Sequence, residues 1–172
     1  MSKKTPVVRE MTDHDRYWLR LAYSASLASD DQQTQVGAVI ARGEELVCRG
    51  VNRFAYKKSV RPDRLVSPEK YHWMIHAESL AIFRMLKQKE NSVGTVMFCP
   101  WACCSECAKN IIMGGVKLVV AHYELMLQTS DKWKHSIDTA QQMLKEAGIS
   151  YVQVSGTVGN IQTTMFGKQW NP

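Results

Sequence analysis

The second half of the chain alternates apolar, strand-like runs with amphipathic helical stretches. Five consecutive segments show this alternation: strands at 93–98, 117–121 and 149–154, separated by helices at 105–113 and 130–147. Strands that alternate with helices pair in parallel, because each crossover helix returns the chain to the same end of the sheet. The order therefore predicts a set of parallel strands with helices packed against it.

The first half adds a helix and a hairpin. Residues 13–29 place apolar side chains at three- and four-residue steps, which predicts an amphipathic helix capped by Thr12 or Asp13. Two strand-like runs, 35–41 and 45–51, are separated by a short loop with a glycine and predict a β-hairpin. This hairpin is expected to add an antiparallel pair to the sheet.

The remaining segments complete the predicted architecture. Residues 53–71 show no regular pattern, and the apolar stretch 71–87 predicts a helix inside the core. The chain has 172 residues, 45% of them hydrophobic and 22% charged, which is ordinary for a soluble globular domain. We expect a single domain over residues 1–172, with a three-layer α/β/α fold and a mixed sheet of about five strands.

No segment of the sequence favours a membrane or an export route. The longest apolar runs, such as 116–121, are far shorter than the ~20 residues needed to cross a bilayer. The first six residues contain lysines with no apolar stretch behind them, so we expect no secretory signal and a cytoplasmic protein. Cysteines in a reducing cytoplasm stay free or bind metal, and three of the five fall within residues 103–107. That spacing favours a metal site over disulfides.

Positive charge is concentrated in one segment. The chain carries 22 Lys and Arg against 16 Asp and Glu, a net charge of +6. Residues 53–70 contain six basic and two acidic side chains, so this segment holds most of the excess. A basic patch of this kind binds an anionic partner, either nucleic acid or a phosphorylated small molecule, unless it is a solvated loop.

Two short motifs carry the chemistry: His76-Ala77-Glu78 and Cys104-Ser105-Glu106-Cys107, each at the start of a predicted helix. A Cys-x-x-Cys pair in this position favours thiolates, because the free N–H groups and the helix dipole stabilise negative charge. One histidine and two cysteines supply three ligands to Zn²⁺ and leave a fourth position for water, whose pKa the metal lowers towards neutrality. Glu78 lies two residues from the histidine and can move the proton of that water.

This combination matches a known signature. His-x-Glu followed by Pro and Cys-x-x-Cys is characteristic of zinc-dependent nucleobase deaminases. The chain resembles the cytidine-deaminase superfamily, and within it the deoxycytidylate (dCMP) deaminases, from about residue 15 to residue 154. The segments that carry the resemblance are 36–40, 50–52, 76–82, 104–112 and 115–120. The run Cys-Ala-Lys-x-Ile-Ile that begins at Cys107 is the part most specific to the dCMP branch.

The resemblance implies a function and a site. It implies hydrolysis of dCMP to dUMP and ammonia, with Zn²⁺ bound by His76, Cys104 and Cys107. It also assigns proton transfer to Glu78 and the nucleotide sugar to Asn52. A homo-oligomer is expected as well, since neighbouring subunits often complete the pockets of this superfamily.

Two positions depart from the family pattern. Cys103 stands directly before the first zinc cysteine, where the family usually has proline, so Cys103 competes with Cys104 for the role of ligand. The two-residue spacing to Cys107 favours Cys104. Leu80 stands two residues after the catalytic glutamate, where the dCMP branch commonly has asparagine. This second departure loosens the assignment of the substrate more than that of the chemistry.

A phosphorylated substrate needs a basic contact, and the basic segment is where we expect it. Arginine suits bidentate recognition of phosphate, so Arg53, Arg61 and Arg64 are the candidates. Ala77, inside the first motif, and Tyr123, just beyond a strand end, are further residues expected at the substrate pocket.

Two other functions remain open on sequence alone. A deaminase acting on RNA, like the tRNA adenosine deaminases, is favoured by Leu80 and by the positive net charge. The dCMP-type run at the second cysteine and the long insert before His76 oppose it. The other alternative is a noncatalytic, zinc-stabilised binding module, which requires a fourth protein ligand from Cys48, Cys99 or Cys103.

Overall fold

The computed structural model describes residues 7–172 of the chain. Residues 1–6, on which the expectation of no secretory signal rests, lie outside the described residues. In chain order the helices and strands are β1 (Val7–Glu10), α1 (Asp13–Ser26), β2 (Gly37–Arg42), β3 (Glu45–Val51), β4 (Arg53–Phe54), the 3₁₀ turns η1 (Lys57–Ser59) and η2 (Pro62–Arg64), α2 (Lys70–Trp73), β5 (Met74–Ile75), α3 (Ala77–Lys87), β6 (Thr95–Phe98), α4 (Ser105–Gly114), β7 (Leu118–His122), α5 (Tyr123–Met126), α6 (Asp131–Glu146), β8 (Ser150–Ser155), β9 (Thr163–Met165) and β10 (Lys168–Trp170).

A central mixed sheet organises the fold. Within residues 7–172 it has six strands, in the order β1-β8-β7-β6-β2-β3. Strands β1, β8, β7 and β6 run parallel to one another, whereas β2 is antiparallel to both β6 and β3. The alternating second half therefore forms the expected parallel part, and the early hairpin forms the antiparallel edge. Strand β1 was not predicted, and it makes the sheet one strand wider than expected.

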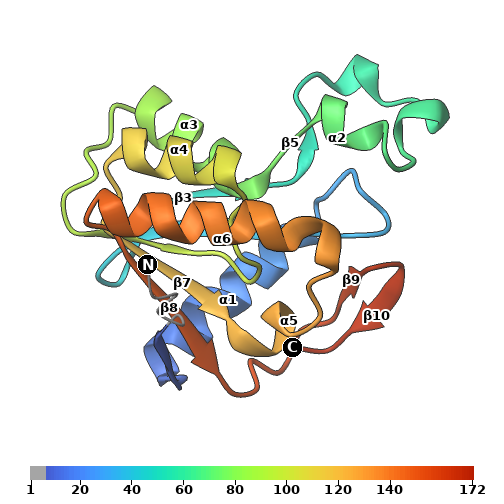
Figure 1. Cartoon of the computed structure of the whole chain (residues 1–172). Helices are drawn as coiled ribbons and strands as arrows, with labels where there is room; N and C mark the ends of the chain where they lie inside the picture. Colours follow the sequence, from blue (N-terminus) through green and yellow to red (C-terminus); the bar gives the residue numbers. More distant parts are fainter. Residues whose placement is uncertain (1–6) are drawn as a thin grey trace.

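Helices cover both faces of the sheet (Figure 1). Helices α3, α4 and α6 lie side by side on one face, where Ile111 and Leu144 are fully buried. Helix α1 covers the other face, and its buried Trp18 belongs to a second apolar cluster. The expected three-layer α/β/α architecture is confirmed. Cys104 and Cys107 belong to the apolar cluster between the sheet and helices α3, α4 and α6. These two predicted metal ligands therefore lie at the edge of that part of the core.

Helix α1 begins with a capping box. The hydroxyl group of Thr12 accepts a hydrogen bond from the backbone N–H of Asp15, and the Asp15 carboxylate accepts one from the backbone N–H of Thr12. Arg9 of β1 donates two more hydrogen bonds to this carboxylate, at 2.6 and 2.9 Å. Asp15 therefore ties the edge strand to the first helix.

Two glycines let the hairpin touch the helices on both faces of the sheet. A Cβ atom on Gly37 would lie 2.0 Å from the carbonyl oxygen of Ala22 in α1. A Cβ atom on Gly50 would lie 2.0 Å from the carbonyl oxygen of Ala77 in α3. Both distances exclude any side chain, so backbone packs directly on backbone. The contact at Gly50 sets how closely the first turn of α3 approaches the sheet.

The predicted helix over 71–87 is wrong in its first part. The structure has a single helical turn, α2, followed by the two-residue strand β5, which pairs with β4 in antiparallel register. Both Met74 and His76 have extended backbone angles, and α3 begins only after His76. Apolar residues continue through the break, so the periodicity of the sequence does not reveal it. The break places His76 at the N-terminus of α3 rather than inside a helix.

Two segments extend beyond the sheet at one end of the molecule (Figure 1). One is the basic segment 53–70, which is mostly irregular as predicted and leads into α2. The other is the C-terminal hairpin of β9 and β10. Residues from both segments line the cavity of the candidate site. In the part of the chain that the structure describes, no helix is both long enough and apolar enough to cross a membrane.

Candidate active site

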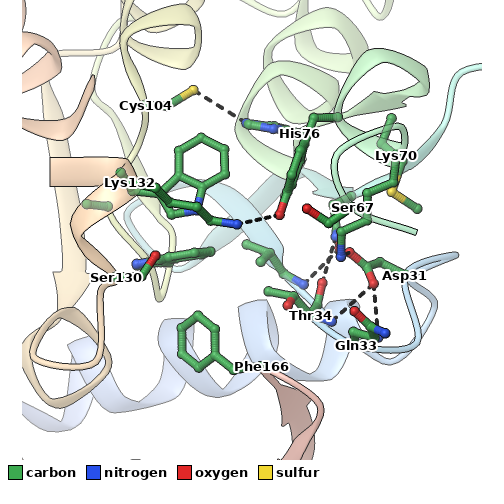
Figure 2. A pocket seen from close by; sticks show the side chains of 18 of the residues that line it. Asp31, Gln33, Thr34, Ser67, Lys70, His76, Cys104, Ser130, Lys132 and Phe166 are labelled. Atoms are coloured by element: carbon green, nitrogen blue, oxygen red, sulfur yellow. Dashed lines mark hydrogen bonds and ion pairs between the residues drawn. The ribbon is translucent and has the colours of Figure 1, made fainter. Parts of the chain in front are cut away.

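Three side chains with metal-binding atoms converge near the surface. The Nδ1 atom of His76 lies 3.4 Å from the sulfur of Cys104 and 3.4 Å from the sulfur of Cys107. All three donor atoms lie within 4.8 Å of one another. Figure 2 shows His76 and Cys104 facing each other across this gap. Among residues 7–172, no other set of three His, Cys, Asp or Glu side chains has this geometry.

Two helix N-termini position these ligands. His76 is the N-cap residue of α3, Cys104 is the N-cap residue of α4, and Cys107 lies in the first turn of α4. Helices α3 and α4 are neighbours on the sheet, so their first turns meet. Unpaired N–H groups at a helix N-terminus stabilise negative charge, and this position favours a thiolate at the N-cap residue Cys104.

Hydrogen bonds within the cluster fix its protonation states. The thiol of Cys107 and the ring of His76 both donate to Cys104, and they lower the pKa of Cys104 to about 4. The same contact raises the pKa of His76 to about 9, although burial opposes this. The hydrogen bond to Cys104, together with burial, raises the pKa of Cys107 well above its usual range. Cys104 is thus the common acceptor of the hydrogen bonds that link the three side chains.

Glu78 lies beside the cluster in the first turn of α3. Its side chain is almost completely buried and lines the same cavity as His76 and Cys104. Burial raises the pKa of the Glu78 carboxyl group, and the nearby His76 only partly offsets this. A carboxyl group with a raised pKa can accept and return a proton near neutral pH, which is what a general acid–base catalyst requires.

Cys103 is fully buried but is not part of the ligand cluster. Burial raises the pKa of its thiol well above the usual range, so it stays protonated. The backbone N–H of Ala102, the residue before Cys103, donates a hydrogen bond of 3.1 Å to the sulfur of Met126 and fixes the position of this loop. In this loop, Cys104 rather than Cys103 lies beside His76.

A cavity of about 500 Å³ opens next to the cluster (Figure 2). Its size is within the range of small-molecule sites in proteins. His76, Glu78 and Cys104 all line it. A molecule bound in the cavity therefore has direct access to two of the three metal-binding residues and to the carboxyl group.

Asn52 also lines the cavity, but most of its amide is already engaged. Its Oδ1 atom accepts hydrogen bonds from the backbone N–H of Val36, at 2.8 Å, and from the hydroxyl of Ser29, at 2.7 Å. Its Nδ2 atom donates to the carbonyl oxygen of Thr34 at 2.7 Å. One N–H of Asn52 is left to meet a ligand.

The three arginines predicted to bind phosphate lie outside the cavity lining. Arg53 pairs with Asp30 at 3.8 Å. Arg61 donates two hydrogen bonds of 3.0 Å to the carboxylate two residues further on. The guanidinium of Arg64 stacks 3.5 Å from the centre of the Trp73 ring. Each arginine thus has a partner within the chain, and its contact with phosphate stays a prediction.

The last two predicted pocket residues differ in their position. Ala77 is fully buried at the first position of α3 and lines the cavity. Tyr123 begins α5 at the end of β7, is half-buried, and does not line the cavity.

Four aromatic residues in the cavity wall were missed by sequence reasoning: Tyr71, Trp101, Trp133 and Phe166. The ring of Trp133 lies 6.3 Å from that of His76, and the ring of Trp101 lies 5.3 Å from that of Phe166, both edge-on. One signal could have located Trp133. It lies in the first turn of α6, the longer helix between β7 and β8, and ligands of such sheets bind beyond the carboxyl ends of parallel strands.

Comparison with known proteins identifies the family. The model of the cytidine and deoxycytidylate deaminase zinc-binding region matches residues 12–123. The chain belongs to this family. The deoxycytidylate deaminase of Mus musculus is 31% identical over 144 residues, which cover 78% of this chain and 76% of the relative. An uncharacterized deaminase of Aliivibrio fischeri is 32% identical over 124 residues, which cover 70% of this chain and 80% of the relative.

Solved structures agree on the fold of the deaminase. The dCMP deaminase from cyanophage S-TIM5, solved in complex with dCMP and dUMP, superposes with a TM-score of 0.65 at 22% identity. The superposition covers 84% of this chain and all of the cyanophage chain. The protein is a hydrolytic deaminase with this fold. Its family-matched region contains the ligand cluster and Glu78, whereas Lys132, Trp133 and Phe166 of the cavity lie beyond that region.

Proposed function

We propose that this deaminase hydrolyses a cytosine deoxynucleotide, dCMP in the first place, to dUMP and ammonia, with Zn²⁺ as its cofactor. The observation that carries the proposal is the joint opening of His76, Cys104 and Glu78 into one cavity. The 31% identity to a deoxycytidylate deaminase over most of both chains supports the choice of substrate.

The donor set fits zinc. Two sulfur atoms and one imidazole nitrogen lie close enough to bind a single ion. Zn²⁺ prefers these donors in tetrahedral geometry, and three protein ligands leave one position open, as in catalytic sites. A zinc ion bound by His76, Cys104 and Cys107 supplies Lewis acidity and an activated water to the reaction.

Glu78 supplies the proton transfers. Its carboxyl group first removes a proton from the attacking water and then delivers it to N3 of the cytosine ring. Glu78 then takes the remaining proton from the new hydroxyl group at C4 and delivers it to the amino group, which leaves as ammonia while the C4–O bond becomes a carbonyl. Because burial raises the pKa of Glu78, the carboxyl group holds each proton readily between the two transfers.

The remaining assignments are part of the same proposal. Asn52, with one free N–H in the cavity, binds the sugar, and Ala77 contacts the base from the start of α3. Residues 1–172 act as a single domain, and the protein assembles as a homo-oligomer. Chromatography with light scattering measures the subunit number directly.

A substrate panel tests the proposal. The purified, zinc-loaded protein is incubated with dCMP, deoxycytidine, 5-methyl-dCMP and an adenosine-containing RNA hairpin, and ammonia release is followed. Release from dCMP is expected, while a Cys104→Ala preparation treated identically controls for contaminating deaminases. Release from the RNA alone would contradict the proposal. A nucleic-acid substrate would also show affinity that falls steeply with salt, because several phosphate contacts are involved.

A further inference from the structure

Two cationic side chains line the cavity, Lys70 and Lys132, and their surroundings differ. The ammonium group of Lys70 is almost fully buried and lies 2.6 Å from the carboxylate of Asp31, which is equally buried. Asp31 also accepts hydrogen bonds from the backbone N–H groups of Gln33 and Thr34. The charge of Lys70 is therefore neutralised inside the protein, and this ion pair serves to hold the cavity wall.

Lys132 has no such counter-charge. Its Nζ atom donates a hydrogen bond of 2.8 Å to the hydroxyl oxygen of Tyr71, which is neutral. Within residues 7–172, no carboxylate lies within 4.0 Å of this ammonium group. The adjacent Asp131 pairs instead with Lys134, at 2.6 Å. No carboxylate in this part of the chain therefore offsets the ammonium group of Lys132, which has two further N–H donors available for a ligand.

The ammonium group lies near the reactive end of the cavity. It is 4.9 Å from the centre of the Tyr71 ring and 5.7 Å from the centre of the Trp133 ring. Trp133 in turn lies edge-on to His76. Figure 2 shows Lys132 entering from α6 and its hydrogen bond crossing the cavity below His76. The ring of Trp133 thus separates the ammonium group of Lys132 from the predicted metal ligand His76.

The Tyr71 hydroxyl holds Lys132 in this position. Burial raises the pKa of Tyr71, but hydrogen bonds from Lys132 and Ser67 outweigh this effect, so the pKa lies below its ordinary value. The contact also joins the arm 53–73 to helix α6 across the cavity. By contrast, Arg61 of the same segment donates a hydrogen bond to Asp63, and the guanidinium of Arg64 stacks on the Trp73 ring.

We propose that Lys132, held by Tyr71, recognises the 5′-phosphate of the nucleotide and so makes the enzyme select nucleotides over nucleosides. The proposal rests on the proposed function and names its specificity-determining residue. One of the two free N–H donors of Lys132 binds a phosphate oxygen, and Tyr71 accepts another hydrogen bond and prevents the flexible side chain from turning into solvent.

The test compares dCMP with deoxycytidine, which has the same base and sugar but no phosphate. Lys132→Met should lower kcat/KM for dCMP roughly 10- to 100-fold, the range expected for one lost charge-assisted hydrogen bond, and should change kcat/KM for deoxycytidine little. Lys134→Met removes an exposed ammonium group from the same helix and is the matched control. It should leave both substrates unaffected. Lys132→Arg should restore part of the preference for dCMP.

Product binding gives a second readout that does not depend on turnover. By titration calorimetry, Lys132→Met should weaken dUMP binding by a similar factor without affecting deoxyuridine. An unchanged preference for dCMP and unchanged dUMP affinity in Lys132→Met would overturn the role of Lys132 while deamination stands. No ammonia from either cytosine compound with the wild-type protein would instead overturn the proposed function. Lower activity on both substrates with unaltered dUMP binding would reduce Lys132 to a structural role and also reject the proposal.

Discussion

The hydroxyl oxygen of Ser79 lies 3.5 Å from the sulfur of Cys107. The same oxygen accepts a hydrogen bond of 2.8 Å from the side chain of Asn110, one turn along α4, so its position is fixed from both sides. Groups that orient a ligand atom in this way typically affect metal affinity without binding the metal themselves.

Ser79→Ala should therefore weaken zinc binding by about 10- to 100-fold and leave the stoichiometry at one ion when zinc is in excess. Competition with a chromogenic chelator measures the affinity. Asn110→Ala, which removes only the support of the hydroxyl, should have a smaller effect in the same direction. Wild-type affinity in Ser79→Ala would show that the hydroxyl does not orient Cys107.

Adjacent cysteines allow a matched pair of variants. Cys104→Ala removes a predicted ligand and should abolish both zinc and activity, whereas Cys103→Ala should retain zinc because this thiol lies outside the cluster. Elemental analysis of the two purified proteins gives the answer. Zinc lost from the Cys103 variant and kept in the Cys104 variant would move the ligand register by one residue.

Glu78→Gln separates metal binding from proton transfer. The glutamine fills the same space, so zinc content and thermal stability should be retained, while turnover should fall by ~10²–10⁴-fold. Glu106→Gln is the control, since Glu106 is exposed between the two cysteines and pairs with Lys109. Near-normal turnover of a zinc-replete Glu78 variant would exclude this residue from the mechanism.

The buried Lys70–Asp31 pair predicts a large stability effect. Lys70→Met leaves a buried carboxylate without its counter-charge and should lower the free energy of unfolding by about 3–5 kcal/mol. Asp31→Asn together with Lys70→Met removes both charges and should recover part of the loss, as measured by urea denaturation. If the double variant were no more stable than Lys70→Met alone, the two charges would not interact across this contact.

Acid stability should depend on Asp15. Burial raises the pKa of this carboxyl group, but its hydrogen bonds with Arg9 and Thr12 outweigh burial, so the pKa lies below its ordinary value. A depressed pKa contributes stability that is present above about pH 4 and is lost as the pH falls through the folded-state pKa. Asp15→Asn should therefore be less stable than wild type at neutral pH, with the difference vanishing in acid. The same difference in the free energy of unfolding between wild type and Asp15→Asn at all pH values would contradict this prediction.

The parts of the fold that sequence reasoning captured have strong local patterns. Alternating segments of the second half, the hairpin with its glycine loop and the helix start at Thr12 each depend on neighbours in the chain. Strand β1 has no such pattern, because its four residues are all exposed and it is stabilised by pairing with β8, far away in sequence. The break before His76 was missed for a similar reason, since the β4–β5 pairing that causes it is not local.

The residues of the candidate site also divide into those with a local sequence pattern and those without one. The predicted metal ligands and Glu78 lie in two short motifs whose spacing reflects helix geometry, so the sequence indicates these candidates directly. Lys132 and Phe166 reach the cavity from α6 and from the C-terminal hairpin. Their approach depends on how separate elements pack, and neither position has a motif. The basic segment was the more conspicuous signal for phosphate, yet its arginines are engaged by neighbouring side chains.

The backbone contact between Gly50 and Ala77 has a consequence for engineering this enzyme. A conventional route to a wider pocket is to trim side chains between a helix and the sheet beneath it, but at this point backbone meets backbone and there is no side chain to trim. The spacing between β3 and the first turn of α3 is therefore closed to redesign by substitution, and any side chain placed at Gly50 would push the start of α3 away from the sheet. The adaptable part is the rim, where Lys132 and Phe166 extend from α6 and from the C-terminal hairpin, neither of which carries a predicted metal ligand.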